Sequence, residues 1–501
     1  MFSKEDLGIL RNHVSNVDSD VYVIKNLPPE VVAVLFAYVS RSPASFRENL
    51  LKLIKSKDLD MGGLVSVYSD RGIDYAEAKE KARKFHEKWV VGYGHSSVAE
   101  HAVASIALEN VSILATKAIE DTRLASFTEK STRYQIFDRE KYYTPGIVMK
   151  SESGGLYKKT CESLFDLYIE ILPKLITHFR KKNPKPKGMG DRVYESVTKA
   201  RACDVARYVL PAATLTNLGM TVNARSLEHM IRKLLSHPLK EMNGIGTNIK
   251  EEVLKIIPTL VKYADLNPYI LETGRAMESL CGGFELERNV KNRPVTLVGY
   301  DRDAENKLVS SIIYRYSHRQ YEDILAKVSK MNAKEKEKVF GEYLKRMGAH
   351  DPPMRELEHV YYTFDILIDY GAFRDIQRHR ICTQTNQELT TTHGYDIPEE
   401  IEKIGYGEKF REAMKSAERT FERIRKRFPK EAQYVVPLAF RKRTLFTWNL
   451  RELYHFVRLR SGKEGHISYR RIAWEVYREL KRVHPLLAKY IKVDLSKGIL
   501  R

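Results

Sequence analysis

Apolar and polar residues along this chain predict a mainly helical protein with few strands. The segment Leu27-Pro-Pro-Glu-Val-Val-Ala predicts a turn leading into an apolar helix, because proline is tolerated where a helix begins. Residues 100–118 are apolar with scattered polar positions, which is typical of a helix buried on most sides. Further helices are predicted over residues 75–93, 226–235, 251–264 and 452–459, a loop over 182–190, and a strand over 295–300. We therefore expect an α+β fold in which helices pack on a modest sheet.

Three sequence blocks occur twice and in the same order. The clearest pair is Arg207-Tyr-Val-Leu-Pro211 before Asn223-Ala-Arg225, and Gln433-Tyr-Val-Val-Pro437 before Asn449-Leu-Arg451. Sixteen residues separate Arg207 from Asn223, and sixteen separate Gln433 from Asn449. Such a recurrence predicts a tandem duplication. We place the first copy at residues 1–290 and the second at 291–501, with a linker over 289–294.

The charge of the chain points to anionic partners. Its 501 residues carry a formal net charge of +20, which suits either nucleic acid or small anions such as nucleotides and phosphorylated cofactors. The basic clusters 425–430 and 441–443 could belong to such a surface, or they could be solvated helix faces and turns. No zinc-finger, RNP or helix-turn-helix pattern accompanies them.

Cysteine usage and hydropathy bound the class of protein further. The cysteines Cys161, Cys203, Cys281 and Cys382 are widely separated, which argues against a disulfide framework and a zinc site and favours a reducing cytoplasm. We predict no metal. The longest apolar runs, such as residues 31–39, are shorter than the roughly 18 residues that cross a bilayer, and the N-terminus has no signal-peptide pattern.

The polar motifs inside the repeats resemble a known family. Copy one has His95, Ser97, Glu100 and His101, followed by Arg123, Ser126, Glu129, Ser131, Arg133 and Tyr134. Copy two has Glu358-His359, followed by Arg378-His379-Arg380. With the later Leu-Pro and Asn-x-Arg segments, these motifs resemble the flavin-dependent thymidylate synthases over most of both copies. Copy one departs at Asp121 and Thr122, where the family has Arg and His, and copy two departs after Arg380.

The resemblance implies a fold, a reaction and an assembly. Members of this family fold as a small sheet flanked by helices, bind FAD, dUMP and methylenetetrahydrofolate, and use NADPH as reductant. They are homotetramers whose active sites lie between subunits. A fused pair would then be half a tetramer, and a homodimer of this chain would complete it. The implied activity is reductive methylation of dUMP to dTMP at sites to which both copies contribute.

The same resemblance assigns roles to individual residues. Arginine forks match phosphate oxygens, and histidine can stack on or donate to a flavin ring. The expected catalytic residues are Arg378, His379, Arg380 and Arg451. The expected cofactor-binding residues are His95, Ser97, His101, Arg123, His359, Arg378, His379, Arg380 and Asn449. The expected substrate-binding residues are Ser126, Glu129, Ser131, Arg133, Arg225, Glu388, Arg451 and Arg460.

Structural roles for these residues stay open beside the functional ones. Arg378-His379-Arg380 could satisfy a helix C-terminus, Glu100-His101 and Glu358-His359 could cap the start of a buried helix, and Asn223 and Asn449 should act as N-caps. Two other functions also stay open. The chain could be a scaffold that binds nucleotide or RNA without turnover, or an enzyme that modifies uridine in RNA.

Overall fold

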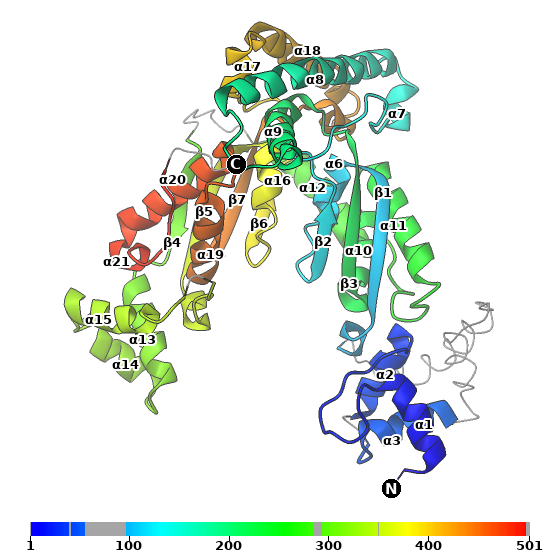
Figure 1. The fold of residues 1–501 in the computed structure, drawn as a ribbon, viewed down its shortest axis with the longest axis vertical. Coiled ribbons are helices and arrows are strands. Elements are labelled where there is room, and N and C mark those ends of the chain that lie inside the picture. The colour runs from blue at the N-terminus through cyan, green and yellow to red at the C-terminus, as the bar shows by residue number, and fades with distance from the viewer. Residues whose placement is uncertain (1, 40–41, 56–96, 285–292, 349, 497–501) are drawn as a thin grey trace. The chain divides into compact units, whose positions relative to one another are not determined.

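The computed structural model describes residues 2–39, 42–55, 97–284, 293–348 and 350–496 (Figure 1). They form two compact units. The described residues of the first lie within Met1–Val111, Ala118–Glu129 and Thr216–Leu286, and those of the second within Ser112–Lys117, Lys130–Leu215 and Glu287–Arg501. Copy one therefore contributes to both units, and the boundary near residue 290 stays a prediction about the duplication.

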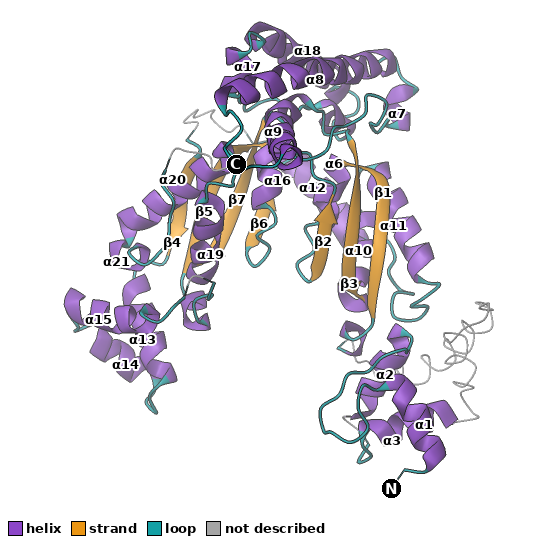
Figure 2. Ribbon diagram, in the orientation of Figure 1, coloured by secondary structure: helices purple, strands orange, loops and turns teal. Residues whose placement is uncertain are grey.

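The first unit combines helices with a small antiparallel sheet (Figure 2). Its sheet has the strand order β1-β3-β2. Its elements are α1 (Lys4–His13), α2 (Pro29–Val39), α3 (Phe46–Lys55), η2 (Val98–Glu100), β1 (Val103–Ser112), β2 (Ala125–Glu129), β3 (Leu215–Asn223), α10 (Ala224–Leu235), α11 (Lys240–Val253) and α12 (Pro268–Gly282), and α6 (Ile113–Ile119) has residues in both units.

The second unit has an antiparallel sheet of order β4-β5-β7-β6 with α19 and α20 packed together beside it. Stacked rings of Phe446, Trp448 and Phe456, with centroids 4.6 Å apart, form part of its core. Its elements are α7 (Gly146–Met149), α8 (Gly154–Lys182), α9 (Asp191–Ala206), η3 (Arg207–Val209), β4 (Val295–Tyr300), α13 (Ala304–Arg315), α14 (Tyr321–Val328), α15 (Ala333–Leu344), η4 (Arg355–His359), β5 (Tyr361–Asp369), α16 (Tyr370–Ile376), β6 (Thr383–Asn386), α17 (Glu399–Lys403), α18 (Gly407–Arg425), η5 (Glu431–Val435), β7 (Arg441–Asn449), α19 (Leu450–Ser461), α20 (Ile467–Val483) and α21 (Pro485–Ala488).

The two sheets repeat the same strand order and register. The order β1-β3-β2 of copy one corresponds to β5-β7-β6 of copy two. Ser126 pairs with Thr221 in one sheet, and Thr383 pairs with Thr447 in the other. Ser126 and Thr383 are therefore equivalent positions, so Thr383 replaces this serine in copy two. The α+β fold with two tandem copies is confirmed.

Within the second unit, the repeated Val-Leu-Pro and Val-Val-Pro segments pair with each other about a local twofold axis. Pro211 and Pro437 face each other in an antiparallel bridge. Around it the backbone exchanges reciprocal hydrogen bonds of 2.8–2.9 Å: Ala212 N to Val436 O, Leu438 N to Leu210 O, Ala213 N to Tyr434 O, and Ala439 N to Tyr208 O. Each bond has a counterpart in which the two copies exchange roles, so the duplication is visible in the backbone itself.

Several local predictions are confirmed, and three are wrong. The helices at α2, α10 and α19, the strand at β4 and the loop between α8 and α9 agree with the sequence pattern. Residues 100–118 are not one helix, because β1 alternates exposed and buried side chains and pairs within a sheet before α6 begins. The segment 251–264 is helical only to Val253, since Pro258 cannot donate the backbone bond that would continue the helix.

The position of the Glu-His pairs also differs from the prediction of a helix start. Glu100 ends the short η2 turn before β1, and Glu358-His359 end η4 before β5. The predicted helix over 75–93 lies outside the described residues, as does most of the linker. None of the described helices is long and apolar enough to cross a membrane.

Candidate functional site

The Arg-His-Arg motif of copy two directly follows a buried helix. Asp369 begins α16 by accepting a hydrogen bond from Ala372 N at 2.8 Å, and the helix ends at Ile376. His379 N then bonds Ile376 O at 3.1 Å, which folds the motif back against the helix end. Arg378 is exposed, Arg380 is half-buried, and His379 is only 5% exposed. The buried imidazole is therefore the one member of the motif whose chemistry the protein interior sets.

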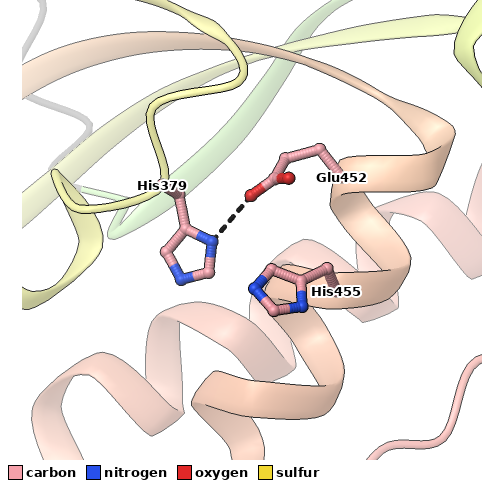
Figure 3. A group of neighbouring side chains, drawn as sticks. All are labelled: His379, Glu452 and His455. Atoms are coloured by element: carbon pink, nitrogen blue, oxygen red, sulfur yellow. Dashed lines mark hydrogen bonds and ion pairs between the residues drawn. The ribbon is translucent and has the colours of Figure 1, made fainter. Parts of the chain in front are cut away.

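Two hydrogen-bond partners fix the tautomer of His379. Arg460 Nε lies 2.9 Å from His379 Nε2, and because a guanidinium can only donate, Nε2 must accept. The ring proton is then on Nδ1, which donates to Glu452 Oε1 at 2.7 Å (Figure 3). Burial, with the nearby Arg460, lowers the pKa of His379 well below its usual range. Burial raises the pKa of Glu452 to about 7.

His379, Glu452 and His455 also have the composition of a metal site, with ligand atoms within 4.8 Å of one another. The electrostatics disfavour a cation there. The nitrogen of His379 that faces Glu452 carries the ring proton, and a guanidinium occupies the other nitrogen. A divalent ion would have to displace both contacts and sit beside Arg460.

A pocket of about 190 Å³ opens beside this group. Asn449 caps α19 by accepting from Glu452 N at 2.8 Å, as predicted, and it lines the pocket. Arg451 is held on the first turn of the helix, where its Nε donates to Pro353 O at 2.7 Å and its Nη1 to Glu358 at 2.9 Å. The wall therefore presents an amide, a guanidinium and a carboxylate in fixed positions.

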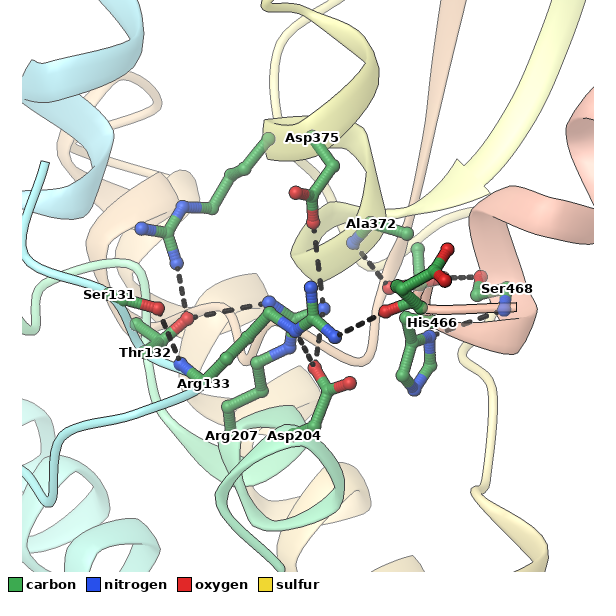
Figure 4. A network of polar contacts seen from close by, with 12 residues as sticks. Ser131, Thr132, Arg133, Asp204, Arg207, Ala372, Asp375, His466 and Ser468 are labelled. Carbon is green, nitrogen blue, oxygen red and sulfur yellow. Dashed lines mark hydrogen bonds and ion pairs between the residues drawn. The ribbon is translucent and has the colours of Figure 1, made fainter. Parts of the chain in front are cut away.

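In the same unit, the Ser-x-Arg segment of copy one reaches residues of copy two (Figure 4). Thr132 Oγ1 lies 3.4 Å from Arg207 Nη1 and 3.1 Å from Arg374 Nη1. Arg133 Nε lies 3.1 Å from Asp204, and its Nη2 donates to the backbone oxygen of Glu464 at 3.3 Å. Thr132, Arg133, Asp204 and Arg207 of copy one thus form one cluster with Arg374 and Asp375 of copy two.

The charges in this cluster leave an excess of cations. Arg207 is 2% exposed and lies 3.2 Å from Asp204 and 3.8 Å from Asp375. Burial alone would raise the pKa of Asp204, but Arg207 and other neighbouring charges outweigh it and lower this pKa. Burial lowers the pKa of His466 to about 4, so this ring is neutral near pH 7.

One carboxylate connects the two groups. Asp375 lies 3.8 Å from Arg460, the partner of His379, and 3.8 Å from Arg207, the partner of Asp204. Charged contacts therefore run from the imidazole of copy two to the Ser-x-Arg segment of copy one without leaving the second unit.

The remaining predicted residues lie elsewhere. In the first unit, Ser97 precedes η2, His101 packs on the ring of Phe36 with centroids 4.6 Å apart, and Arg225 pairs with Glu100. Arg123, Ser126 and Glu129 also belong to that unit, and His95 lies outside the described residues. In the second unit, His359 is exposed and Glu388 pairs with Lys430 at 2.5 Å.

The sequence prediction did not include seven residues of the two groups: Thr132, Asp204, Arg207, Arg374, Asp375, Glu452 and His455. Glu452 and His455 lie inside the repeated block that begins at Asn449, so inspection of that block could have found them. Arg207 could have been found because the repeated block has Gln433 at the equivalent position of copy two, and such a difference between the copies points to a role specific to copy one. Asp204, Arg374 and Asp375 gave no signal, because they lie outside the repeated motifs and contact residues far away in sequence, such as Arg133, Thr132 and Arg207.

Comparison with known proteins decides the family. A family model described as thymidylate synthase complementing protein matches residues 45–259 and 296–486. The chain belongs to this family. The predicted resemblance is confirmed, and the two matched regions fall in the two copies.

Individual relatives agree with the family match. The chain is 36% identical to a UPF0159 protein of Chlamydia pneumoniae over 99% of this chain and 96% of that protein. It is 26% identical to a flavin-dependent thymidylate synthase of Pyrococcus furiosus over 38% of this chain and 72% of that enzyme. A crystal structure of the Helicobacter pylori flavin-dependent thymidylate synthase complexed with FAD and dUMP aligns with 40% of this chain and 100% of that chain, at 18% identity and a TM-score of 0.30.

Proposed function

We propose that this chain is a flavin-dependent enzyme that methylates dUMP to dTMP at a composite site within the second unit. Copy two supplies His379, with Arg378, Arg380 and Arg451, and copy one supplies Ser131 and Arg133. The observation that carries the proposal is the position of Asp375, 3.8 Å from both Arg460 and Arg207, which joins the two groups. FAD, methylenetetrahydrofolate and NADPH are the proposed cofactor and cosubstrates, and a homodimer is the proposed assembly.

The residues beside His379 fit part of a flavin. The pocket of about 190 Å³ is smaller than the roughly 300 Å³ at which small-molecule sites usually begin, so it would hold one portion of the dinucleotide. Its lining offers Asn449 for a polar ring edge, and Arg451 and Arg458 for phosphate oxygens. When bound, a reduced flavin supplies hydride.

The side chains of this chain would orient the reactants. His379 holds its proton on Nδ1 and stays neutral, because burial and Arg460 disfavour the imidazolium. Glu452 keeps the ring in this tautomer. Arg133 carries a fixed positive charge beside the Ser131 hydroxyl, which accepts from Arg133 N at 3.1 Å, and this pair suits the phosphate of a nucleotide.

The basic cluster of residues 441–443 supports the nucleic-acid alternative weakly. Arg441 pairs with Asp396, and Arg443 pairs with Asp365 at 2.8 Å, so both cations already have carboxylate partners on the protein. A phosphate backbone would have to compete with these carboxylates. Arg133 is also paired, with Asp204 at 3.1 Å, but it lines a cavity of about 510 Å³, a size that suits a small molecule. We therefore propose a mononucleotide substrate in preference to RNA.

Flavin binding by the purified full-length chain tests the proposal. We expect FAD fluorescence to be quenched on titration, and dUMP to be converted to dTMP when methylenetetrahydrofolate and NADPH are supplied. Arg378→Ala should weaken FAD binding at least about tenfold, the loss of one charge-assisted contact. Asp121→Ala is the matched control, because Asp121 stands at the corresponding place in copy one. A chain that binds no FAD, or an Arg378→Ala variant that binds it as tightly as the parent, overturns the proposal.

A further inference from the structure

The duplication provides two equivalent places for a phosphate group in the second unit, and their residues differ. Strand register makes Glu129 equivalent to Asn386, since Glu129 pairs with Leu218 and Asn386 with Thr444 in the matching strands. Continuing along each chain segment, Ser131 corresponds to Glu388 and Arg133 to Thr390.

The bridge between Pro211 and Pro437 extends the comparison. Counting back from these prolines, Arg207 corresponds to Gln433 and Asp204 to Lys430. Both arginines of the copy-one cluster are therefore replaced in copy two by uncharged side chains.

The place built around Arg133 has room and two guanidinium groups. It borders a cavity of about 510 Å³, which is within the usual range for small-molecule sites. Arg201 of α9 lines this cavity, and its buried Nε has no hydrogen-bond partner among the described residues. Lys182 also lines the cavity but pairs with Glu400 at 3.1 Å. Two further carboxylates line the cavity: Asp204 lies 3.1 Å from Arg133 Nε, and Glu464 is exposed.

Arg201 is the distinctive feature of this cavity. Burial lowers its pKa, and the structure gives it no ion pair among the described residues. A partly buried guanidinium without a carboxylate is costly unless an anion arrives to bind it. A phosphate monoester would accept bonds from Arg133 and Arg201 together.

The equivalent place in copy two is already closed by the protein. Glu388 is ion-paired with Lys430 at 2.5 Å, and the Lys430 side chain is 18% exposed. In copy one, Arg207 contacts Thr132. At the equivalent positions of copy two, Gln433 Oε1 accepts a hydrogen bond from Leu389 N at 3.0 Å, which holds the loop in place. A carboxylate at the serine position repels a phosphate, and Thr390 adds no charge.

We infer that each chain has one site for a nucleoside monophosphate, held by Arg133 and Arg201, and that the equivalent place in copy two binds none. This inference rests on the proposed function for its choice of ligand. It adds Arg201 as a phosphate-binding residue and sets the stoichiometry at one nucleotide per chain.

Calorimetric titration of the full-length chain with dUMP tests this inference. We expect one dUMP per chain. Arg133→Ala and Arg201→Ala should each weaken binding at least about tenfold, because each removes a charge-assisted contact. The matched controls are Thr390→Ala, at the place equivalent to Arg133, and Arg192→Ala, an exposed arginine on the same helix as Arg201. Both controls should bind like the parent.

The outcomes separate this inference from the proposed function. Two dUMP per chain, unchanged binding by Arg201→Ala, or weakened binding by Thr390→Ala overturns the single site even if the chain converts dUMP. One dUMP per chain without any FAD binding supports the single site and overturns the proposed enzyme. No heat with dUMP at millimolar concentration overturns the inference. The variant Arg133→Lys keeps the positive charge and should bind dUMP more tightly than Arg133→Ala does. That recovery would show that Arg133→Ala weakens binding through the lost charge and not through unfolding.

Discussion

Replacing Glu452 by glutamine should change how the stability of the protein depends on pH. The carboxyl is 12% exposed, and burial raises its pKa to about 7 from an ordinary 4.5. Between these values the folded state binds more protons at this group than the unfolded state does. The free energy of unfolding therefore falls as pH rises, by at most about 1.4 kcal/mol per pH unit.

His379 acts in the opposite direction. Burial lowers its pKa, so below about pH 6.5 the unfolded state binds the extra proton and stability rises with pH. In the parent the two slopes oppose each other below about pH 6.5. Glu452→Gln removes the slope that comes from Glu452. The free energy of unfolding of the variant, relative to that of the parent, should therefore increase by about 2 to 3 kcal/mol as pH rises from about 5 to about 7.

Urea unfolding of the full-length parent and variant, at several pH values in this window, measures the difference directly. Glu422→Gln is the control, because Glu422 is an exposed residue of α18 in a surface pair with Arg425 at 3.0 Å. Its difference from the parent should stay within a few tenths of a kcal/mol. A constant difference between Glu452→Gln and the parent across the window would refute the reasoning. It would show that the hydrogen bond from His379 keeps Glu452 ionised with an ordinary pKa.

Two further predictions concern other buried contacts. Arg460→Leu, which installs the residue found at the equivalent Leu234, should free His379 Nε2 and weaken FAD binding about tenfold in a fluorescence titration; an unchanged affinity would contradict it. Thr160→Val and Thr420→Val should each destabilise the protein by about 1 to 3 kcal/mol in urea unfolding, since their hydroxyls, 2.8 Å apart, are buried and each is the other's partner. The double variant should cost less than the two singles together, and strict additivity would contradict this coupling.

Local rules predicted the helix caps and the repeat, because both depend on residues close in sequence. Asn223 and Asn449 cap α10 and α19 as expected, each accepting a backbone N–H three residues on. The strand β1 was mistaken for a helix because its alanines favour helix locally, whereas its pairing partner β3 is about a hundred residues away.

The candidate site was predictable only where a sequence motif contained its residues. His379 and Arg133 were found from the repeated motifs, but the partners that set their charge states were not. Asp204, Asp375 and Glu452 come from three different elements, and no spacing rule brings them together. The tautomer of a buried imidazole depends on such partners. The sequence therefore predicted His379 but not which of its ring nitrogens carries the proton.

Fusion of the two copies offers a physical reason for their unequal motifs. In a symmetric oligomer of a single repeat, each position serves in every site, so a substitution damages all of them. In one chain, His379 and its equivalent Thr122 are separate positions, as are Arg133 and Thr390. Copy one can then have Thr122 in place of the imidazole, and copy two can have Thr390 in place of the arginine. The chain still keeps one imidazole, His379, and one arginine, Arg133, for a single combined site. In the proposed function, the contacts of Asp375 with Arg460 and Arg207 join His379 to Arg133 in this combination. On this argument, restoring arginine at Thr390 alone would not create a second site, because Gln433 and the pair of Glu388 with Lys430 would still hold the loop closed.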